Sequence, residues 1–265
     1  MSKHLSKEEI IQNKKKSIIQ LNQLLESYIA NDNQIRKADL VSKWIKDYVK
    51  YLKFEEHFDP IKNITYKRGN IIKVNFGFNV GAELGGVHYA VVLDNDNKHS
   101  SATVTVAPMS SVKPNKPVHQ NNLNIGSEFY NILDSRLNIL SAELNKELFA
   151  VQKYINLFDE LKKIYNNDNS SVAQRNEVIK LSEDYRVEAQ KKLDYIHSQM
   201  NILKKNKNEL LLMSHGSIIK LDQIRTISKM RINIPKHKND VLYELSLSKP
   251  TMTKVNEKLK DLYIF

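Results

Sequence analysis

The fold is decided by residues 68–112, which read RGNIIKVNFGFNVGAELGGVHYAVVLDNDNKHSSATVTVAPMSSV. At its start the sequence alternates, with Ile72, Val74 and Phe76 on one face and more polar residues between them. Alternation of this kind predicts a strand with one buried face. The glycine-rich residues 77–86 that follow predict a mobile loop rather than a regular element.

Two more strands are predicted in the second half of this stretch. Residues 90–93 form a short apolar run, typical of a strand buried on both faces. Residues 94–97 are Asp-Asn-Asp-Asn, which favours a turn, and residues 103–109 predict a third strand. A meander of short strands around a glycine loop indicates a small curled sheet or barrel.

In the sequence, helices are predicted before and after this sheet and at the end of the chain. Apolar residues recur at intervals of three and four over residues 5–30 and 34–53, and Ser6 with Glu9 fits a capping box. Two interpretations stay open for this pair of helices: a docking arm for a partner, or a hairpin covering one face of the sheet. The second is favoured because an apolar stripe is usually core. A last helix is predicted over residues 251–263.

The middle of the chain predicts a helical hairpin. From Leu133 to Phe158, and again from Val178 to Leu203, apolar residues are spaced by three or four, close to the coiled-coil period. The polar residues 166–171 between them predict a turn, so the two helices should fold back as an antiparallel pair. Dimerisation, binding of a partner protein or sensing are roles open to it, as is a decoration without a role.

Two separated segments resemble one family, the MazF/PemK toxins. The sequences RGNIIKVNFG, VGAELGGVHYAVVLDND and TVTVAPMSS are similar to the family's opening half, in which RGDI is followed by GsEqGG-x-RP and a valine-rich strand with an ND turn. GSIIKLDQIRTISKMRI, at residues 216–232, resembles its closing strand and the segment after it. The resemblance covers residues 66–126 and 209–265. It implies an α+β fold with a small SH3-like barrel, to which this chain adds N-terminal helices and an inserted antiparallel coiled-coil hairpin. The expected domains are residues 1–60, 61–126, 127–208 and 209–265.

Charge and composition fit this resemblance. The chain has a formal net charge of +11 and no cysteine, and most of the excess positive charge falls in residues 61–126 and 209–265. A basic surface suits a polyanion such as RNA, although lysine-rich surfaces also serve solubility. Without cysteine, a signal-like N-terminus or a long apolar run, we expect a soluble cytoplasmic protein.

The resemblance also implies the chemistry, which is RNA cleavage without a metal or cofactor, through attack of a 2′-hydroxyl on the adjacent phosphate. The family's catalytic Arg aligns with His88 and its catalytic Thr or Ser with Ser110, while Tyr89 stands where the family has Pro. Histidine titrates near neutral pH whereas arginine keeps its proton, so His88 could shuttle a proton. We assign the missing positive charge to Arg225 rather than Arg68.

Further residues match the family's RNA groove. We expect RNA contacts from the glycine loop and from two later positions: Glu83, Gly85, Gly86, Asn95, Asp96 and Gln223. Each has a plainer role available, such as backbone support of the loop for Glu83 or turn formation for Asn95 and Asp96. Lys113, Lys116 and His119, in the loop after the third strand, could meet phosphate or simply face solvent.

The resemblance implies a translation-inhibiting, sequence-specific endoribonuclease that cuts single-stranded mRNA. Its expected partners are that RNA, an antitoxin protein and a second copy of the chain, with no membrane involved. The alternative is a non-catalytic module that binds RNA or protein and lost cleavage with its Arg. A third possibility, a poison of the related gyrase-toxin barrel, is disfavoured by the GG-x and QIRTI motifs. No metal-ligand spacing or nucleotide-binding motif occurs in the sequence.

Overall fold

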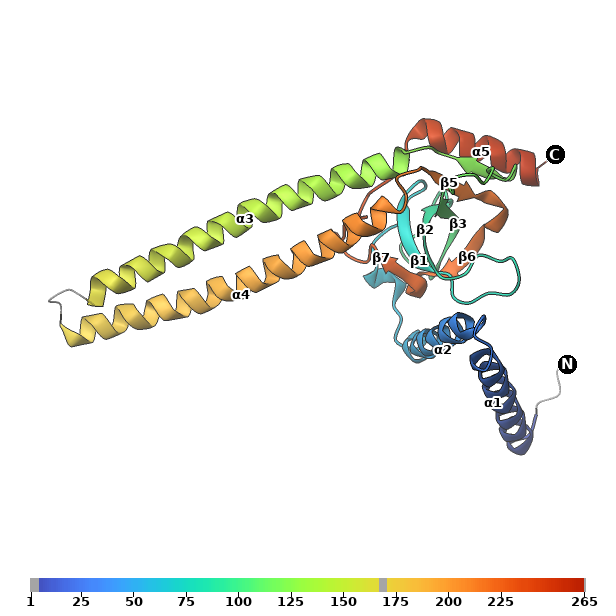
Figure 1. Ribbon diagram of the computed structural model, residues 1–265, viewed down its shortest axis with the longest axis horizontal. Helices are drawn as coiled ribbons and strands as arrows, with labels where there is room; N and C mark the ends of the chain where they lie inside the picture. Colours follow the sequence, from blue (N-terminus) through green and yellow to red (C-terminus); the bar gives the residue numbers. More distant parts are fainter. Residues whose placement is uncertain (1–4, 167–170, 265) are drawn as a thin grey trace.

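The structure is a computed structural model that describes residues 5–166 and 171–264. Figure 1 shows three parts: a small body built on a sheet, a long arm of two helices that projects from it, and two N-terminal helices below the body. Within the described residues, no helix is long and apolar enough to span a membrane.

The body contains one antiparallel sheet whose strands come from two distant parts of the sequence. Its strand order is β4-β5-β3-β2-β1-β7, with β6 also paired to β3. The β5 and β6 strands both pair with β3, around residues 109–111 and 103–106 respectively. The body combines helices with this sheet, and the sheet is open. Its closure into an SH3-like barrel stays a prediction. The strands are β1 Ile71–Asn75, β2 Val87–Val92, β3 Thr103–Ser111, β4 Asn122–Asn124, β5 Ser217–Lys220, β6 Arg225–Ser228 and β7 Ile232–Ile234.

Both sides of the sheet are buried, and side chains alternate between two clusters. Ile72, Val74 and Phe76 pack in one cluster as the alternation predicts, but Ile71 is equally buried in the other. The prediction of a single buried face for β1 is therefore wrong, because helices and loops cover the opposite side. The predicted strand buried on both faces at residues 90–93 is confirmed, as is the third strand, which runs on to Ser111.

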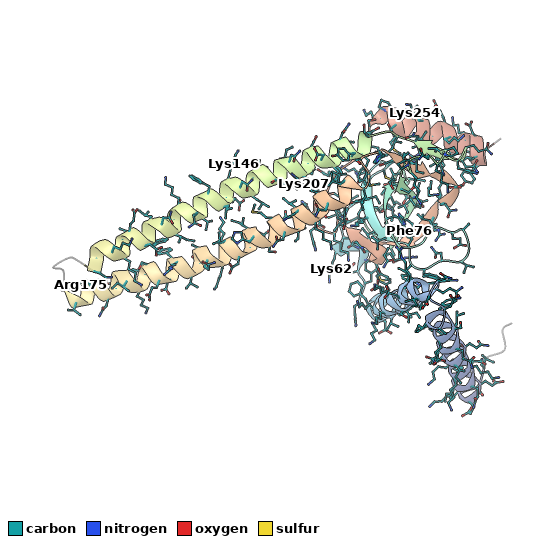
Figure 2. The ribbon with its side chains drawn as sticks, viewed as in Figure 1. Lys62, Phe76, Lys146, Arg175, Lys207 and Lys254 are labelled. Carbon is teal, nitrogen blue, oxygen red and sulfur yellow. The ribbon has the colours of Figure 1, made fainter. Side chains whose placement is uncertain are left out.

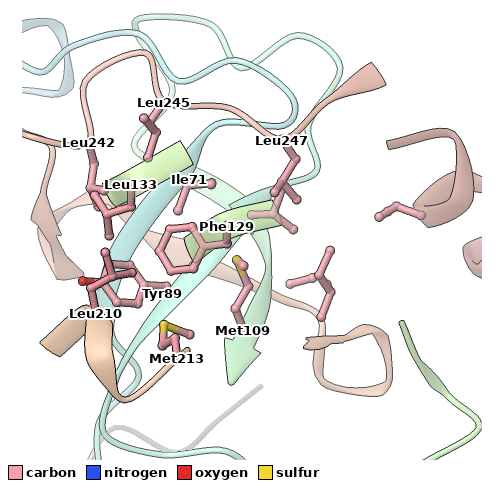
Figure 3. Packing of buried hydrophobic residues seen from close by; sticks show 14 of the residues in the cluster. Ile71, Tyr89, Met109, Phe129, Leu133, Leu210, Met213, Leu242, Leu245 and Leu247 are labelled. Carbon is pink, nitrogen blue, oxygen red and sulfur yellow. The ribbon is translucent and has the colours of Figure 1, made fainter. Parts of the chain in front are cut away.

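The arm begins inside the core. It consists of α3 Glu128–Asn166 and α4 Val172–Leu211, which lie side by side as the sequence predicts (Figure 1). Phe129, Leu133 and Leu137 at the base of α3 are fully buried, and the ring centroids of Phe129 and Tyr89 are 4.8 Å apart. Figure 3 shows Phe129 and Leu133 among side chains from the sheet, from the end of α4 and from residues 242–247.

Two details of the predicted hairpin are left open. Of the turn expected at residues 166–171, residues 167–170 lie outside the described part of the chain. Coiled-coil packing of the two helices stays a prediction.

The two N-terminal helices behave differently from each other. They span Lys7–Ile29 (α1) and Ile35–Glu55 (α2), and the capping box of Ser6 and Glu9 is present. On α2, Trp44 packs against Gly77 and lies 5.3 Å from the Arg231 guanidinium. No residue of α1 is buried. α2 thus contacts the body through Trp44, whereas the expectation that α1 covers the sheet is wrong. That α2 covers a face of the sheet stays a prediction.

The remaining elements close the body. The last helix, α5 Lys249–Tyr263, begins with Ser248 as its N-cap and buries Val255. Residues 241–247 form turns with one isolated bridge between Asn70 and Ser246. Short 3-10 helices occur at η1 Pro60–Lys62, η2 Leu221–Gln223 and η3 Lys229–Arg231.

Candidate active site

The site is built where β2 begins and β3 ends. Ala90 of β2 pairs with Pro108 of β3, and this antiparallel register, continued by two residues, sets His88 opposite Ser110. On its other edge, Ser110 pairs with Ile218 of β5. His88 and Ser110 line one cavity of about 850 Å³. The structure therefore brings together the two residues that the sequence predicts as catalytic.

The imidazole of His88 is held by backbone contacts. Its Nε2 lies 3.0 Å from the carbonyl oxygen of Gly85 in the loop before β2. Burial lowers the pKa of His88, and the positive charge of Lys220 lowers this pKa further. Hydrogen bonds to the backbone of Gly85 and Met109 act in the opposite direction and favour the charged imidazolium. Because burial dominates, the neutral imidazole is favoured, which is the form that accepts a proton.

Several cations surround this histidine. Lys220, the last residue of β5, lines the cavity and forms no ion pair among the described residues. Lys113, Lys116 and His119 line the same cavity, which is where a phosphate contact would require them. Lys73 also lines it but is paired with Glu209 at the end of α4.

Sequence reasoning missed Lys220. Its strand alternates, with Ser217 and Ile219 buried, so Lys220 could be placed on the less buried side. Nothing in the sequence says that this strand lies beside the end of β3, and that pairing is what brings Lys220 to the cavity.

A loop of residues 77–86, here the glycine loop, covers one end of the cavity. It is closed at its base by Phe76 N–H donating to Gly86 and by Gly86 N–H donating to Gly77. A Cβ at Gly85 would lie 2.7 Å from the Gly77 carbonyl oxygen, so only glycine allows this approach. The close packing of Gly85 holds its own carbonyl against His88.

The glycine loop is tied to the second segment of the sequence at two points. The backbone amide of Leu84 donates to the side-chain oxygen of Gln223 at 3.1 Å. Arg225 Nη2 lies 3.3 Å from Glu83 Oε2. Gln223 lines the cavity with His88, but Arg225 is not among the residues that line it. Arg225 thus lies beside the loop, paired with a carboxylate.

Other predicted residues lie elsewhere. Asn95 and Asp96 are exposed in the turn after β2, at the opposite end of that strand from His88. The Arg68 guanidinium forms structural hydrogen bonds within the body, since it donates to the Leu93 carbonyl and to the Asn256 side chain. Over the described ranges, no group of three or more His, Asp or Glu side chains is placed to hold a metal ion.

The fold and site define an α+β protein with a histidine, a hydroxyl and lysines in one cavity. Residues 67–146 match the model of a family described as PemK-like, MazF-like toxin of type II toxin-antitoxin system. This segment is therefore similar to that toxin family, and the predicted resemblance is confirmed. The matched segment includes His88 and Ser110 and ends within α3. A comparison with curated proteins found no match. The resemblance of residues 209–265 stays a prediction.

Proposed function

We propose that this protein is the toxin of a type II toxin–antitoxin pair and a sequence-specific endoribonuclease that cuts single-stranded mRNA and so inhibits translation. The family match supports the toxin assignment. The observation that carries the enzyme assignment is the shared cavity of His88, Ser110 and Lys220. A base, a hydroxyl and a cation are what phosphodiester cleavage by an internal nucleophile requires.

The proposed reaction needs no group from outside the RNA except proton donors and acceptors. The 2′-oxygen forms a bond to phosphorus as the bond from phosphorus to the 5′-oxygen breaks. The products are a 2′,3′-cyclic phosphate and a free 5′-hydroxyl. A base removes the 2′-hydroxyl proton, an acid protonates the leaving 5′-oxygen, and cations stabilise the extra charge on phosphorus.

We assign His88 as the base, because its lowered pKa keeps it neutral near pH 7. The Ser110 hydroxyl is placed to hold a phosphate oxygen beside it. Lys220 supplies positive charge without any rearrangement, since it already lines the cavity and forms no ion pair in the described part of the chain. Arg225 would reach the phosphate only after leaving Glu83, so we assign it to holding the glycine loop.

RNA on either side of the cut would lie along the cationic wall of this cavity. Lys113, Lys116 and His119 are the proposed phosphate contacts. The glycine loop, with Glu83, Gly85 and Gly86, together with Gln223, would close over a base. Asn95 and Asp96 would contact only RNA that extends to the far end of β2.

Our proposal for the architecture follows the family. The curled sheet would be its SH3-like barrel, split into residues 61–126 and 209–265, with residues 1–60 as an extension. The inserted hairpin, residues 127–208, would be an antiparallel coiled coil. We propose a cytoplasmic homodimer that is neutralised by an antitoxin.

The test is cleavage of a long single-stranded RNA in EDTA, with mapping of the new ends. Wild type should give discrete cuts with 5′-hydroxyl ends, and His88→Ala should give none. His57→Ala is the matched control, because His57 is exposed and does not line the cavity. Folded wild type that binds RNA yet cuts none of a varied set would instead favour the non-catalytic module.

A further inference from the structure

The arm carries a groove that nothing in the described chain fills. Two cavities, of about 990 and 400 Å³, lie between α3 and α4 and share Glu147 as a lining residue. On α3 their lining runs from Arg136 to Phe158, roughly 33 Å at the helical rise. The groove therefore begins at the body and continues outward along the arm.

The groove has the lining expected of a helix-binding site. Tyr154, Tyr185, Tyr195 and Ile202 line it and are about half exposed or more. On α4 the lining includes a series spaced by three and four, as in a heptad seam: Tyr185, Glu188, Lys192, Tyr195, Gln199 and Ile202. Figure 2 shows the side chains that project along the arm. Two helices present such a seam on one side when a third helix completes the packing.

One helix of the same chain, α1, leaves most of its apolar stripe exposed, although Tyr28 near its C-terminal end contacts Lys37 of α2. On α1, Ile11, Lys14, Ile18, Leu21, Leu25 and Tyr28 follow heptad spacing, and no residue of this helix is buried. Ile18 is 58% exposed. At 23 residues, α1 is roughly 35 Å long, which matches the length of the groove. Figure 1 shows α1 on the other side of the body from the arm, so it cannot fill its own groove in this arrangement.

Charges agree with one orientation of α1 in the groove. The middle of the groove is lined by Glu147 of α3, and the middle of α1 carries Lys14, Lys15 and Lys16. With the C-terminal end of α1 at the body, its lysines lie about 21 Å out along the arm, within roughly one helical turn of Glu147, by the helical rise of 1.5 Å per residue. In that orientation Glu26 faces the base of the groove.

We propose that α1 of one copy binds in the arm groove of a second copy. A two-fold arrangement, in which each copy's α1 fills the other's groove, would bury both apolar surfaces at once. This inference concerns assembly and does not depend on RNA cleavage.

Cross-linking between two single-cysteine chains tests the contact and its orientation, because the natural chain has no cysteine. In the proposed orientation Ile11 lies level with Tyr154. Full-length Ile11→Cys is mixed with tagged Tyr154→Cys and treated with a short bifunctional maleimide. A cross-linked hetero-pair is expected. The controls are Ile19→Cys, on the opposite face of α1, and Phe149→Cys, an exposed residue that does not line the groove.

Sedimentation then measures the energetic role of the contact. Ile18→Glu and Tyr154→Glu should each weaken self-association about tenfold or more, whereas Ile19→Glu and Phe149→Glu should not. Lys14→Glu should weaken it and should be rescued by mixing with chains carrying Glu147→Lys. Cross-linking no greater than in the controls, or self-association unchanged by the seam variants, would overturn the proposal. So would a wild type that stays monomeric and whose groove binds only another protein.

Discussion

Arg225 donates to Glu83 across the two halves of the sheet, with 3.3 Å between Nη2 and Oε2. Gly85, two residues after Glu83 in the glycine loop, contacts His88 through its carbonyl oxygen. Gln223, two residues before Arg225, accepts a hydrogen bond from the Leu84 amide. The second sequence segment thus holds the loop that in turn orients the histidine. Because the charge of Arg225 is paired with Glu83 and holds the loop, it is not free to stabilise the phosphate. Lys220 is therefore expected to stabilise the phosphate, and Arg225 to hold the loop.

Lys220→Gln should lower the cleavage rate constant far more than Arg225→Gln. Loss of a group that stabilises transition-state charge costs about 10²–10³ in kcat, and we expect this for Lys220. For Arg225→Gln we expect a few-fold loss, because Glu83 is largely exposed and a screened ion pair contributes at most about 1 kcal/mol. Single-turnover cleavage at saturating enzyme measures both. The reverse order of losses would return the charge-stabilising role to Arg225.

The pH dependence of cleavage should show an acid limb centred below the ordinary histidine pKa of about 6.5. Burial and Lys220 lower the pKa of His88, so the neutral base persists to lower pH and activity falls only as pH drops through that value. Removing the charge of Lys220 should raise the pKa of His88 and move the limb to higher pH. Cleavage rates of wild type and Lys220→Gln across this range check the shift.

His88→Arg is the matched variant, because arginine restores the family residue and keeps its proton throughout. Its acid limb should be absent. An unchanged limb in either variant would show that another group titrates.

Alternation predicted β1, and a short apolar run predicted β2, because side-chain direction and local hydrophobicity can be read from neighbouring residues. Alternation did not predict that Ile71 would be as buried as Ile72, since burial of the second face depends on α3 and on residues 242–247. The pairing of strands is even harder to predict from the sequence than their burial. The sequence does not say that β5 and β6 share β3, and so Lys220 escaped notice while His88 and Ser110, both in the recognised motif, did not.

The apolar stripes of α1 and α2 look alike in the sequence, yet only α2 packs on the body. Periodicity reports that a face is apolar and leaves open what covers it. For α2 the answer is specific, because Trp44 occupies the space that only a glycine at residue 77 leaves open.

Gly77→Ala should therefore destabilise the protein more than Gly81→Ala. Both glycines have positive φ, +79° and +62°, so each substitution carries a backbone cost of about 1–2 kcal/mol. A Cβ at residue 77 would also lie 2.6 Å from the Trp44 ring, whereas nothing lies within 4 Å at residue 81. Urea denaturation should show an extra loss of about 1 kcal/mol or more for Gly77→Ala. Equal losses would indicate that α2 moves away at little cost.

The base of α3 should contribute to the stability of the whole body. Leu137 is fully buried, whereas Ile139, two residues on, is 56% exposed. Leu137→Ala removes methyl groups from the cluster that contains Tyr89 and Phe129, and such buried truncations cost about 2–5 kcal/mol. Ile139→Ala should change the free energy of unfolding by at most about 0.5 kcal/mol. Fluorescence of Trp44, which lies on α2 and not on the arm, reports whether the body unfolds with the helix. If Leu137→Ala left the Trp44 transition unchanged, the arm would fold separately from the sheet. A lower midpoint for that transition would show that the first turns of α3 are structural parts of the body, as their inclusion in the family match to residue 146 suggests.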